Sequence, residues 1–348
     1  MLNNNAAIKN KDMPTRQLGS TGIEISALSL GSWNSYGRIV NDQKMINEII
    51  SRGYESGIRF FDMADVYERG AAEESMGTAL KTHNRESLIL SSKVYMRMSD
   101  DPSDIGLSKE RIMGGIDNSL RRIGTDYLDL YFCHRFDPNT PLEETIVAMN
   151  QLIQSGKIRH WGTSMWNADQ IKSAFDIAAE LNMVPPAVEQ PELSLLSSEK
   201  YEFDSGPELR KRNMGVVTFS PLASGILSGK YDNGIPDNSR FAKKNKADML
   251  HAALMNEASL QRTRAFKSLA DKLECSRSQL AIAWAAAQPG VSSVITGATH
   301  LDQLNENLGA INITIDTETA EELKRIFSIS LMEKARHKVG RLFKKAFN

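Results

Sequence analysis

The chain is poor in cysteine and has no long apolar run. Only two cysteines, Cys133 and Cys275, occur in 348 residues, and their spacing fits neither a zinc site nor a disulfide framework. No apolar stretch approaches the roughly 20 residues that a membrane-spanning helix needs, and the first twelve residues are too polar for a secretory signal. We therefore expect a cytoplasmic protein in a reducing environment, without a disulfide or a metal centre.

An excess of charge of one sign is also missing. The chain has 42 Lys and Arg against 43 Asp and Glu, a formal net charge of -1. Because nucleic-acid binding needs clustered positive charge, no nucleic-acid partner is expected. The pattern Gly-x-Gly-x-x-Gly does not occur, and the segment from Gly225 to Lys230 fails the spacing of a phosphate-binding loop. The sequence therefore carries no motif that indicates a doubly wound nucleotide-binding fold.

Eight short apolar runs are present instead, and each is followed by a segment with helical periodicity. Runs that are nearly continuous in apolar residues are typical of parallel strands covered on both faces. Eight strand-then-helix units over about 300 residues predict an α/β fold of the (β/α)8 class, the TIM barrel. The runs are residues 27–33, 58–62, 87–94, 128–134, 158–164, 187–190, 215–221 and 292–297.

The predicted barrel spans residues 13–330 as one domain. Residues 1–12 are rich in Asn and Lys, and we expect a disordered tail there. The turn sequence GSTG at 19–22 lies between two β-prone pieces and predicts a hairpin that closes the amino-terminal mouth of the barrel. Residues 331–348 read as a basic amphipathic helix. Packing on its own barrel is the favoured role of this helix, and binding to an anionic membrane or an acidic partner is the alternative.

Three helix starts can be assigned from capping residues. In the segment TPLE at 140–143, Thr140 is expected to be the N-cap, with proline at the first helical position and a glutamate that completes a capping box. Asn167 and Ser276 are expected to begin two further helices. Asp65 is expected to cap the helix that carries Glu73.

Four polar residues, Asp62, Tyr67, Lys93 and His134, follow successive predicted strands, where a (β/α)8 barrel places its reactive groups. Taken singly, each has an ordinary structural role, but together they can polarise and protonate a carbonyl oxygen. We expect Lys93 to lower the pKa of the Tyr67 phenol, Asp62 to keep Lys93 charged, and a neutral His134 to hold the oxygen. The carbonyl carbon then needs a hydride. Because side chains cannot donate one, the set implies a nicotinamide cofactor.

The segments that carry these residues resemble the aldo-keto reductase superfamily along almost the whole chain. They are FDMADVY at 61–67, SSK at 91–93 and LDLYFCH at 128–134. The segments DPNTPLEET at 137–145 and SPLASGILSGKY at 220–231 are similar to the branch that contains the voltage-gated potassium-channel β subunits and their bacterial relatives. This resemblance implies that Asp62, Tyr67, Lys93 and His134 form a catalytic tetrad. Channel β subunits carry asparagine at the His134 position, so the histidine favours a working reductase.

The same resemblance implies NADPH as cofactor. An arginine and a hydroxyl at a helix start suit its 2′-phosphate, and Arg240 and Thr299 stand at those positions. Phe219 stands where an aromatic ring stacks on the nicotinamide. The implied cofactor residues are Gly31, Ser32, Trp33, Asp62, Ser164, Gln190, Phe219, Ser220, Leu222, Gly225, Lys230, Arg240, Gly297, Thr299, Gln303, Glu306 and Asn307.

The expected function is the NADPH-dependent reduction of an aldehyde or ketone, with a small-molecule carbonyl substrate. Two alternatives stay open: an NADPH-binding regulatory or redox-sensing subunit with slow turnover, and a sugar or polyol dehydrogenase. A membrane partner is not favoured, and a homo-oligomer is left open. The residues expected to wall the substrate pocket, with loop packing as the alternative, are Trp33, Tyr36, Tyr67, Met165 and Trp166.

Overall fold

The computed structural model describes residues 12–101, 104–237, 239–243 and 251–328. Eight parallel strands form a closed barrel, which closes where the last strand pairs with both its predecessor and the first. The predicted (β/α)8 class is therefore confirmed, and every barrel strand lies inside one of the predicted apolar runs. The strands are β3 (Leu28–Gly31), β4 (Phe60–Asp62), β5 (Ile89–Val94), β6 (Leu128–Cys133), β7 (Ile158–Ser164), β8 (Val188–Gln190), β9 (Gly215–Thr218) and β10 (Ser293–Thr296).

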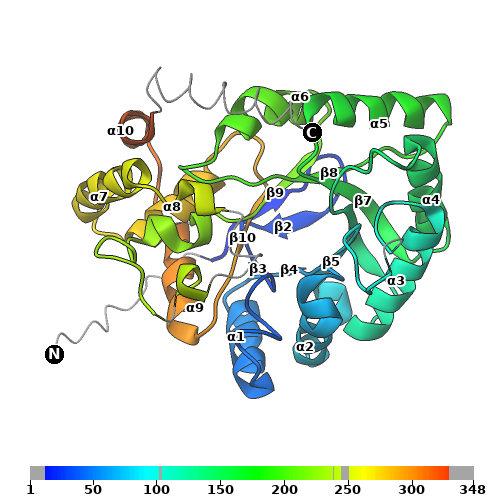
Figure 1. Cartoon of the computed structure of the whole chain (residues 1–348), viewed down its shortest axis with the longest axis horizontal. Coiled ribbons are helices and arrows are strands. Elements are labelled where there is room, and N and C mark those ends of the chain that lie inside the picture. The colour runs from blue at the N-terminus through cyan, green and yellow to red at the C-terminus, as the bar shows by residue number, and fades with distance from the viewer. Residues whose placement is uncertain (1–11, 102–103, 238, 244–250, 329–348) are drawn as a thin grey trace.

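Helices surround the strands (Figure 1), because each carries an apolar stripe that is buried against the sheet. The barrel helices are α1 (Gln43–Glu55), α2 (Ala71–Leu80), α3 (Lys109–Ile123), α4 (Leu142–Gln154), α5 (Ala168–Glu180), α6 (Gly206–Lys211), α8 (Arg277–Ala286) and α9 (Leu301–Leu308). Helices α7 (Glu257–Lys272) and α10 (Thr317–Phe327) pack on each other. Short 3-10 or π-helical turns are η1 (Tyr67–Gly70), η2 (Arg85–Ser87), η3 (Tyr201–Ser205), η4 (Ala223–Ser228), η5 (Phe241–Lys243) and η7 (Gly309–Asn312).

A β-hairpin closes the amino-terminal mouth of the barrel, as predicted. Strands β1 (Thr15–Gln17) and β2 (Glu24–Ser26) pair antiparallel, and Leu18 and Ile25 are fully buried in the cluster of side chains that fills the barrel. Gly19 adopts a φ of 54°, and a Cβ there would lie 2.2 Å from the backbone nitrogen of Gly215 at the start of β9. Only glycine permits this close approach between the hairpin turn and the barrel.

Two of the three predicted helix starts are confirmed. Asn167 and Ser276 form capping boxes at the starts of α5 and α8. Thr140 does not cap α4, which begins at Leu142 without a side-chain cap. The Thr140 hydroxyl instead donates to the Asp137 carboxylate, 2.7 Å away. A hydrogen bond to a carboxylate is stronger than the neutral hydrogen bond that a capping hydroxyl accepts from a helix amide.

The two terminal predictions cannot be placed. Residues 1–11, expected to be a disordered tail, and residues 331–348, expected to be a basic amphipathic helix, lie outside the described residues. Within the described ranges, no helix has both the length and the apolar content that crossing a bilayer requires.

Candidate active site

A cavity of about 1020 Å³ lies at the carboxyl ends of the barrel strands. The terminal residues of five strands line it: Gly31, Asp62, Ser164, Gln190 and Thr296. Parallel strands bring their carboxyl ends to one rim, so residues far apart in sequence face a common space. Asp62, Tyr67 and His134 of the predicted tetrad are among the residues that line this cavity.

Lys93 and Asp62 form a buried ion pair beneath the cavity. Lys93 is fully buried, and its Nζ donates to Asp62 Oδ2 at 2.7 Å. The second Asp62 oxygen accepts from Ser91 Oγ at 2.8 Å and from Gln190 Nε2 at 3.0 Å. Burial would lower the pKa of Lys93, but the charge and the hydrogen bond of Asp62 oppose this, and the pKa lies above its ordinary value overall. The lysine is therefore held as an ammonium.

The Tyr67 ring lies between the other members of the tetrad. Lys93 Nζ is 4.9 Å from the centroid of this ring, and the His134 ring meets it edge to face at 5.7 Å. Lys93 acts to lower the pKa of the phenol, as expected, but the net shift is upward. Burial raises the pKa of Tyr67 above its ordinary value, and the opposing charge of Lys93 does not offset this effect because Asp62 acts against it. At neutral pH the phenol therefore keeps its proton.

His134 is a neutral imidazole in this environment. Burial lowers the pKa of His134 well below its ordinary value, and the positive charges of Lys93 and Arg135 lower it further. Its Nδ1 is buried without a hydrogen-bond partner among the described residues. A neutral imidazole can act as a hydrogen-bond donor to a carbonyl oxygen, which is the form that the sequence analysis expects.

Most of the implied cofactor residues lie along this same cavity. Two do not line it. The amide and hydroxyl of Ser32 both donate to the carbonyl oxygen of Asp62, at 3.0 and 3.3 Å, and the Glu306 carbonyl oxygen accepts from Gln279 Nε2 at 3.0 Å. The lining residues among them are Gly31, Trp33, Asp62, Ser164, Gln190, Phe219, Ser220, Leu222, Gly225, Lys230, Arg240, Gly297, Thr299, Gln303 and Asn307.

The segment after β9 turns sharply along the cavity. Ser220, Ala223 and Ser224 have φ angles of 57°, 46° and 56°, and Gly225 has 87°. Left-handed residues in such turns orient backbone amides into anion-binding concavities. The φ of Gly225 is one that residues with a side chain rarely adopt, so glycine is favoured where the Lys230 side chain lies against the segment. The turn, the lysine and the aromatic wall at Phe219 suit a dinucleotide with a pyrophosphate bridge.

Comparison with known proteins agrees with this geometry. Residues 27–327 match the sequence model of the Aldo/keto reductase family. The chain belongs to the aldo/keto reductase family. It is 41% identical over 304 residues to an Arabidopsis thaliana protein named "Probable voltage-gated potassium channel subunit beta", across 86% of this chain and 92% of that protein. It is also 41% identical over 320 residues to an Oryza sativa subsp. japonica protein of the same name, across 91% and 96% of the two chains.

Both the predicted superfamily and the predicted branch are thereby confirmed. Membership of the aldo/keto reductase family supports an oxidoreductase activity, and its members generally bind NADP(H).

A hydrogen-bonded trio that the sequence analysis missed lies beside the cofactor segment of this aldo/keto reductase. His251 is fully buried; its Nδ1 contacts Ser224 Oγ at 2.7 Å and its Nε2 contacts Glu192 Oε1 at 3.1 Å. Ser224 itself lines the cavity. The three residues come from separate segments, so no local pattern relates them. The trio fastens the turn after β9 to the rim beyond β8.

Three of the five residues expected to wall the substrate pocket lie elsewhere. Tyr36 and Trp166 are fully buried in the core and are not among the residues that line the cavity. Met165 is not among the lining residues either, and its sulfur accepts from the amide of Glu192 at 3.3 Å. Large aromatic rings bury more apolar area between barrel and helices than at an open rim. Trp33 and Tyr67 do line the cavity.

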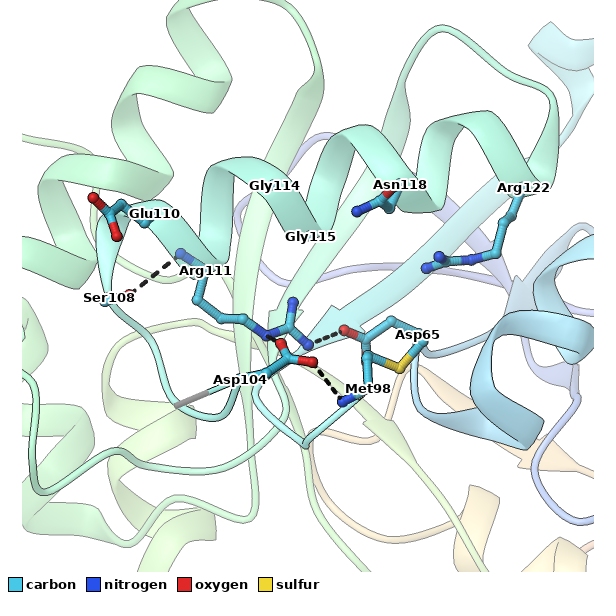
Figure 2. Close-up of a pocket in the computed structure, with 10 residues that line it drawn as sticks. All are labelled: Asp65, Met98, Asp104, Ser108, Glu110, Arg111, Gly114, Gly115, Asn118 and Arg122. Atoms are coloured by element: carbon cyan, nitrogen blue, oxygen red, sulfur yellow. Dashed lines mark hydrogen bonds and ion pairs between the residues drawn. The ribbon is translucent and has the colours of Figure 1, made fainter. Parts of the chain in front are cut away.

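Asp65 is not the helix cap that we expected, because the N-cap of α2 is Gly70. Its carboxylate lies beside a second cavity of about 350 Å³ (Figure 2) and pairs with Arg111 at 2.6 Å. Arg111 also pairs with Asp104 at 3.0 Å. Burial raises the pKa of Asp65 to about 6 even though Arg111 opposes the rise. The pair ties the loop that carries Tyr67 to α3.

Glu189 is expected to make the stability of the folded chain depend on pH. This buried carboxyl on β8 accepts from the Thr163 hydroxyl and from the amide of Trp166, and burial raises its pKa from 4.5 to about 7. Between these two values the folded chain holds a proton that the unfolded chain has lost. The Glu189 contribution to stability therefore falls as pH rises through this window and stays low above pH 7.

The test replaces Glu189 with glutamine, which cannot titrate. We expect the melting temperature of Glu189→Gln, relative to wild type, to rise between pH 5 and pH 8. The exposed Glu202→Gln on η3 serves as control and should show no such trend. A constant difference between Glu189→Gln and wild type across this range would show that Glu189 ionises normally.

Proposed function

We propose that this chain is an NADPH-dependent reductase of aldehydes or ketones. The observation that carries the proposal is the position of the Tyr67 ring, which lies at the cavity wall between the buried Lys93–Asp62 pair and His134. A phenol that holds its proton at neutral pH suits donation to a carbonyl oxygen.

The four side chains have complementary roles in this proposal. NADPH, when bound, supplies the hydride that reaches the carbonyl carbon. Tyr67 donates its proton to the carbonyl oxygen, and the ammonium of Lys93 stabilises the phenolate that remains. Asp62 keeps Lys93 charged and fixed in position. His134 donates a hydrogen bond that orients the carbonyl oxygen toward Tyr67.

The cavity offers a different group to each part of the cofactor. Phe219 would stack on the nicotinamide ring, while Ser164 and Gln190 lie on adjacent strands that would hold its carboxamide. Gln190 already donates its amide nitrogen to Asp62, which leaves its amide oxygen to accept from the cofactor. The turn at Gly225 would hold the pyrophosphate. The adenosine end would meet Arg240, Thr299, Gln303 and Asn307.

Arg240 is expected to determine the preference for NADPH over NADH through the 2′-phosphate. We expect Arg240→Met to weaken NADPH binding by roughly 10- to 100-fold, because a hydrogen bond to a charged group contributes about 1.5–3 kcal/mol. NADH lacks the 2′-phosphate, so its affinity should change by less than about twofold. Titration calorimetry with both nucleotides measures the difference, with the exposed Arg121→Met as control. An equal loss of affinity for NADPH and NADH would indicate that Arg240 contacts a part of the nucleotide that both share.

A regulatory or redox-sensing role is the second candidate. It is favoured by the plant relatives named as probable potassium-channel β subunits and by the trio Ser224–His251–Glu192, which would slow cofactor exchange by fastening the turn over the cavity. Steady-state rates with a panel of aldehydes separate the two roles. Negligible rates with tight NADPH binding would favour the sensor, and its partner would then be sought among potassium channels.

A further inference from the structure

Arg135 is a cavity residue that the sequence analysis did not single out. It follows His134 directly, is partly buried, and lines the cavity together with Tyr67 and His134. Its positive charge acts on both neighbours, since it contributes to lowering the pKa of His134 and opposes the rise in the pKa of Tyr67. The guanidinium therefore lies at the end of the cavity where the proposed chemistry takes place.

The carboxylates nearest to Arg135 are engaged with other groups. Glu189 and Glu192 act on it through their charge. Glu189 accepts from Thr163 and from the amide of Trp166, and Glu192 bonds to His251. The hydrogen bond of Arg135 within the described residues goes to the carbonyl oxygen of His134, its own neighbour. Its planar fork of five N–H donors thus keeps capacity for another acceptor.

The other charges at this end of the cavity are balanced in pairs. Asp62 is paired with Lys93 at 2.7 Å, and Glu68, also on the cavity wall, is paired with Arg38 at 3.9 Å. His134 is neutral. Apolar groups of Trp33, Val66 and Met96 form much of the remaining wall. Glu189 and Glu192 act on Arg135 through their charge, but among the described residues no carboxylate oxygen lies within the 4.0 Å of an ion pair with its guanidinium.

We propose that Arg135 binds a carboxylate group of the carbonyl substrate, so that the substrate class is aldehydes or ketones with a carboxylate. This inference rests on the reductase function proposed above. Arginine binds carboxylates through two parallel hydrogen bonds, which fixes orientation as well as position. In a partly desolvated cavity this contact is stronger than in water. A carboxylate held by Arg135 would orient the carbonyl group toward Tyr67 and His134.

The test compares matched charged and neutral substrates. We would measure kcat/KM with NADPH for 2-, 3- and 4-carboxybenzaldehyde and for the methyl ester of each. Wild type should favour at least one acid over its ester by about tenfold or more, the usual scale of a charge-assisted hydrogen bond. Arg135→Met should lose most of this preference, so that the rates with the acids fall by about tenfold more than the rates with their esters. Arg135→Lys, which keeps the charge but not the fork, should retain part of it.

The remaining outcomes separate this inference from the proposed function. Ester reduction without any preference for acids in wild type, or with a preference unchanged in Arg135→Met, would overturn the inference and leave the reductase intact. An equal loss of kcat/KM for acids and esters in Arg135→Met would indicate that Arg135 acts on the pKa of Tyr67, and it would also overturn the inference. The exposed Arg121→Met on α3 controls for general charge effects and should match wild type.

If neither acids nor esters are reduced, the reductase proposal fails. Calorimetric binding of the carboxybenzaldehydes to the protein with NADP+ then decides the role of Arg135. Binding to wild type that is lost in Arg135→Met supports a carboxylate site. No binding to wild type, or equal binding to wild type and Arg135→Met, overturns the inference.

Discussion

Replacing Tyr67 with phenylalanine should reduce carbonyl turnover by roughly 10²–10⁴-fold, the usual contribution of a general acid. The substitution removes the hydroxyl and keeps the ring, so the edge-to-face contact with His134 at 5.7 Å is preserved. The measurement is single-turnover oxidation of NADPH by an aldehyde, followed by absorbance.

Cofactor binding is the control for this variant. Titration calorimetry should give the same NADPH affinity for Tyr67→Phe and wild type within about twofold, because Tyr67 is not among the proposed cofactor contacts. A Tyr67→Phe variant that still turns over at the wild-type rate would rule out Tyr67 as the proton donor. A variant that loses NADPH binding would show that Tyr67 has a structural role in the cavity.

Breaking the Asp62–Lys93 pair should give the largest loss of stability. Lys93 is fully buried, and Lys93→Met would leave the Asp62 carboxylate with only the neutral donors Ser91 and Gln190. Removing one partner of a buried pair typically costs about 3–5 kcal/mol, because the other charge remains buried without compensation. We expect a loss of this size for Lys93→Met and for Asp62→Asn, measured by urea unfolding.

The double variant separates stability from catalysis. Asp62→Asn combined with Lys93→Met removes both charges of this pair, so the stability of the double variant should recover toward wild type. Its turnover should stay low, because the ammonium beside Tyr67 is absent. The exposed pair Lys267 and Asp271, one helical turn apart at 2.6 Å, is the matched control, and its removal should cost less than about 0.5 kcal/mol. Additive losses in the double variant would contradict a direct coupling of the buried pair.

The barrel itself could be predicted because its strands are local signals. Each apolar run is continuous within the sequence, and burial on both faces of a parallel sheet requires that composition. The capping boxes at Asn167 and Ser276 are equally local, since a side chain bonds an amide three residues away. The position of Asp62 and His134 on one rim follows from strand direction alone.

Polar contacts that sequence periodicity does not record explain the errors; one is local, and the others join distant segments. Thr140 bonds Asp137 instead of the helix, and Asp65 pairs with Arg111, 46 residues away. His251 reaches Glu192 across 59 residues. Sequence periodicity records which residues are buried but not which polar partners meet, because that depends on how loops from different strands are folded against one another.

By itself, the sequence determined the closed barrel, its hairpin and many of the residues that line the carboxyl-end rim. Tertiary structure alone decided the direction of the Tyr67 pKa shift, since burial and Asp62 outweigh Lys93 there. It also decided that Tyr36 and Trp166 belong to the core and that Arg135 faces the cavity. The physical reason is that burial and electrostatic balance are properties of a whole site, to which each strand and loop contributes only one part.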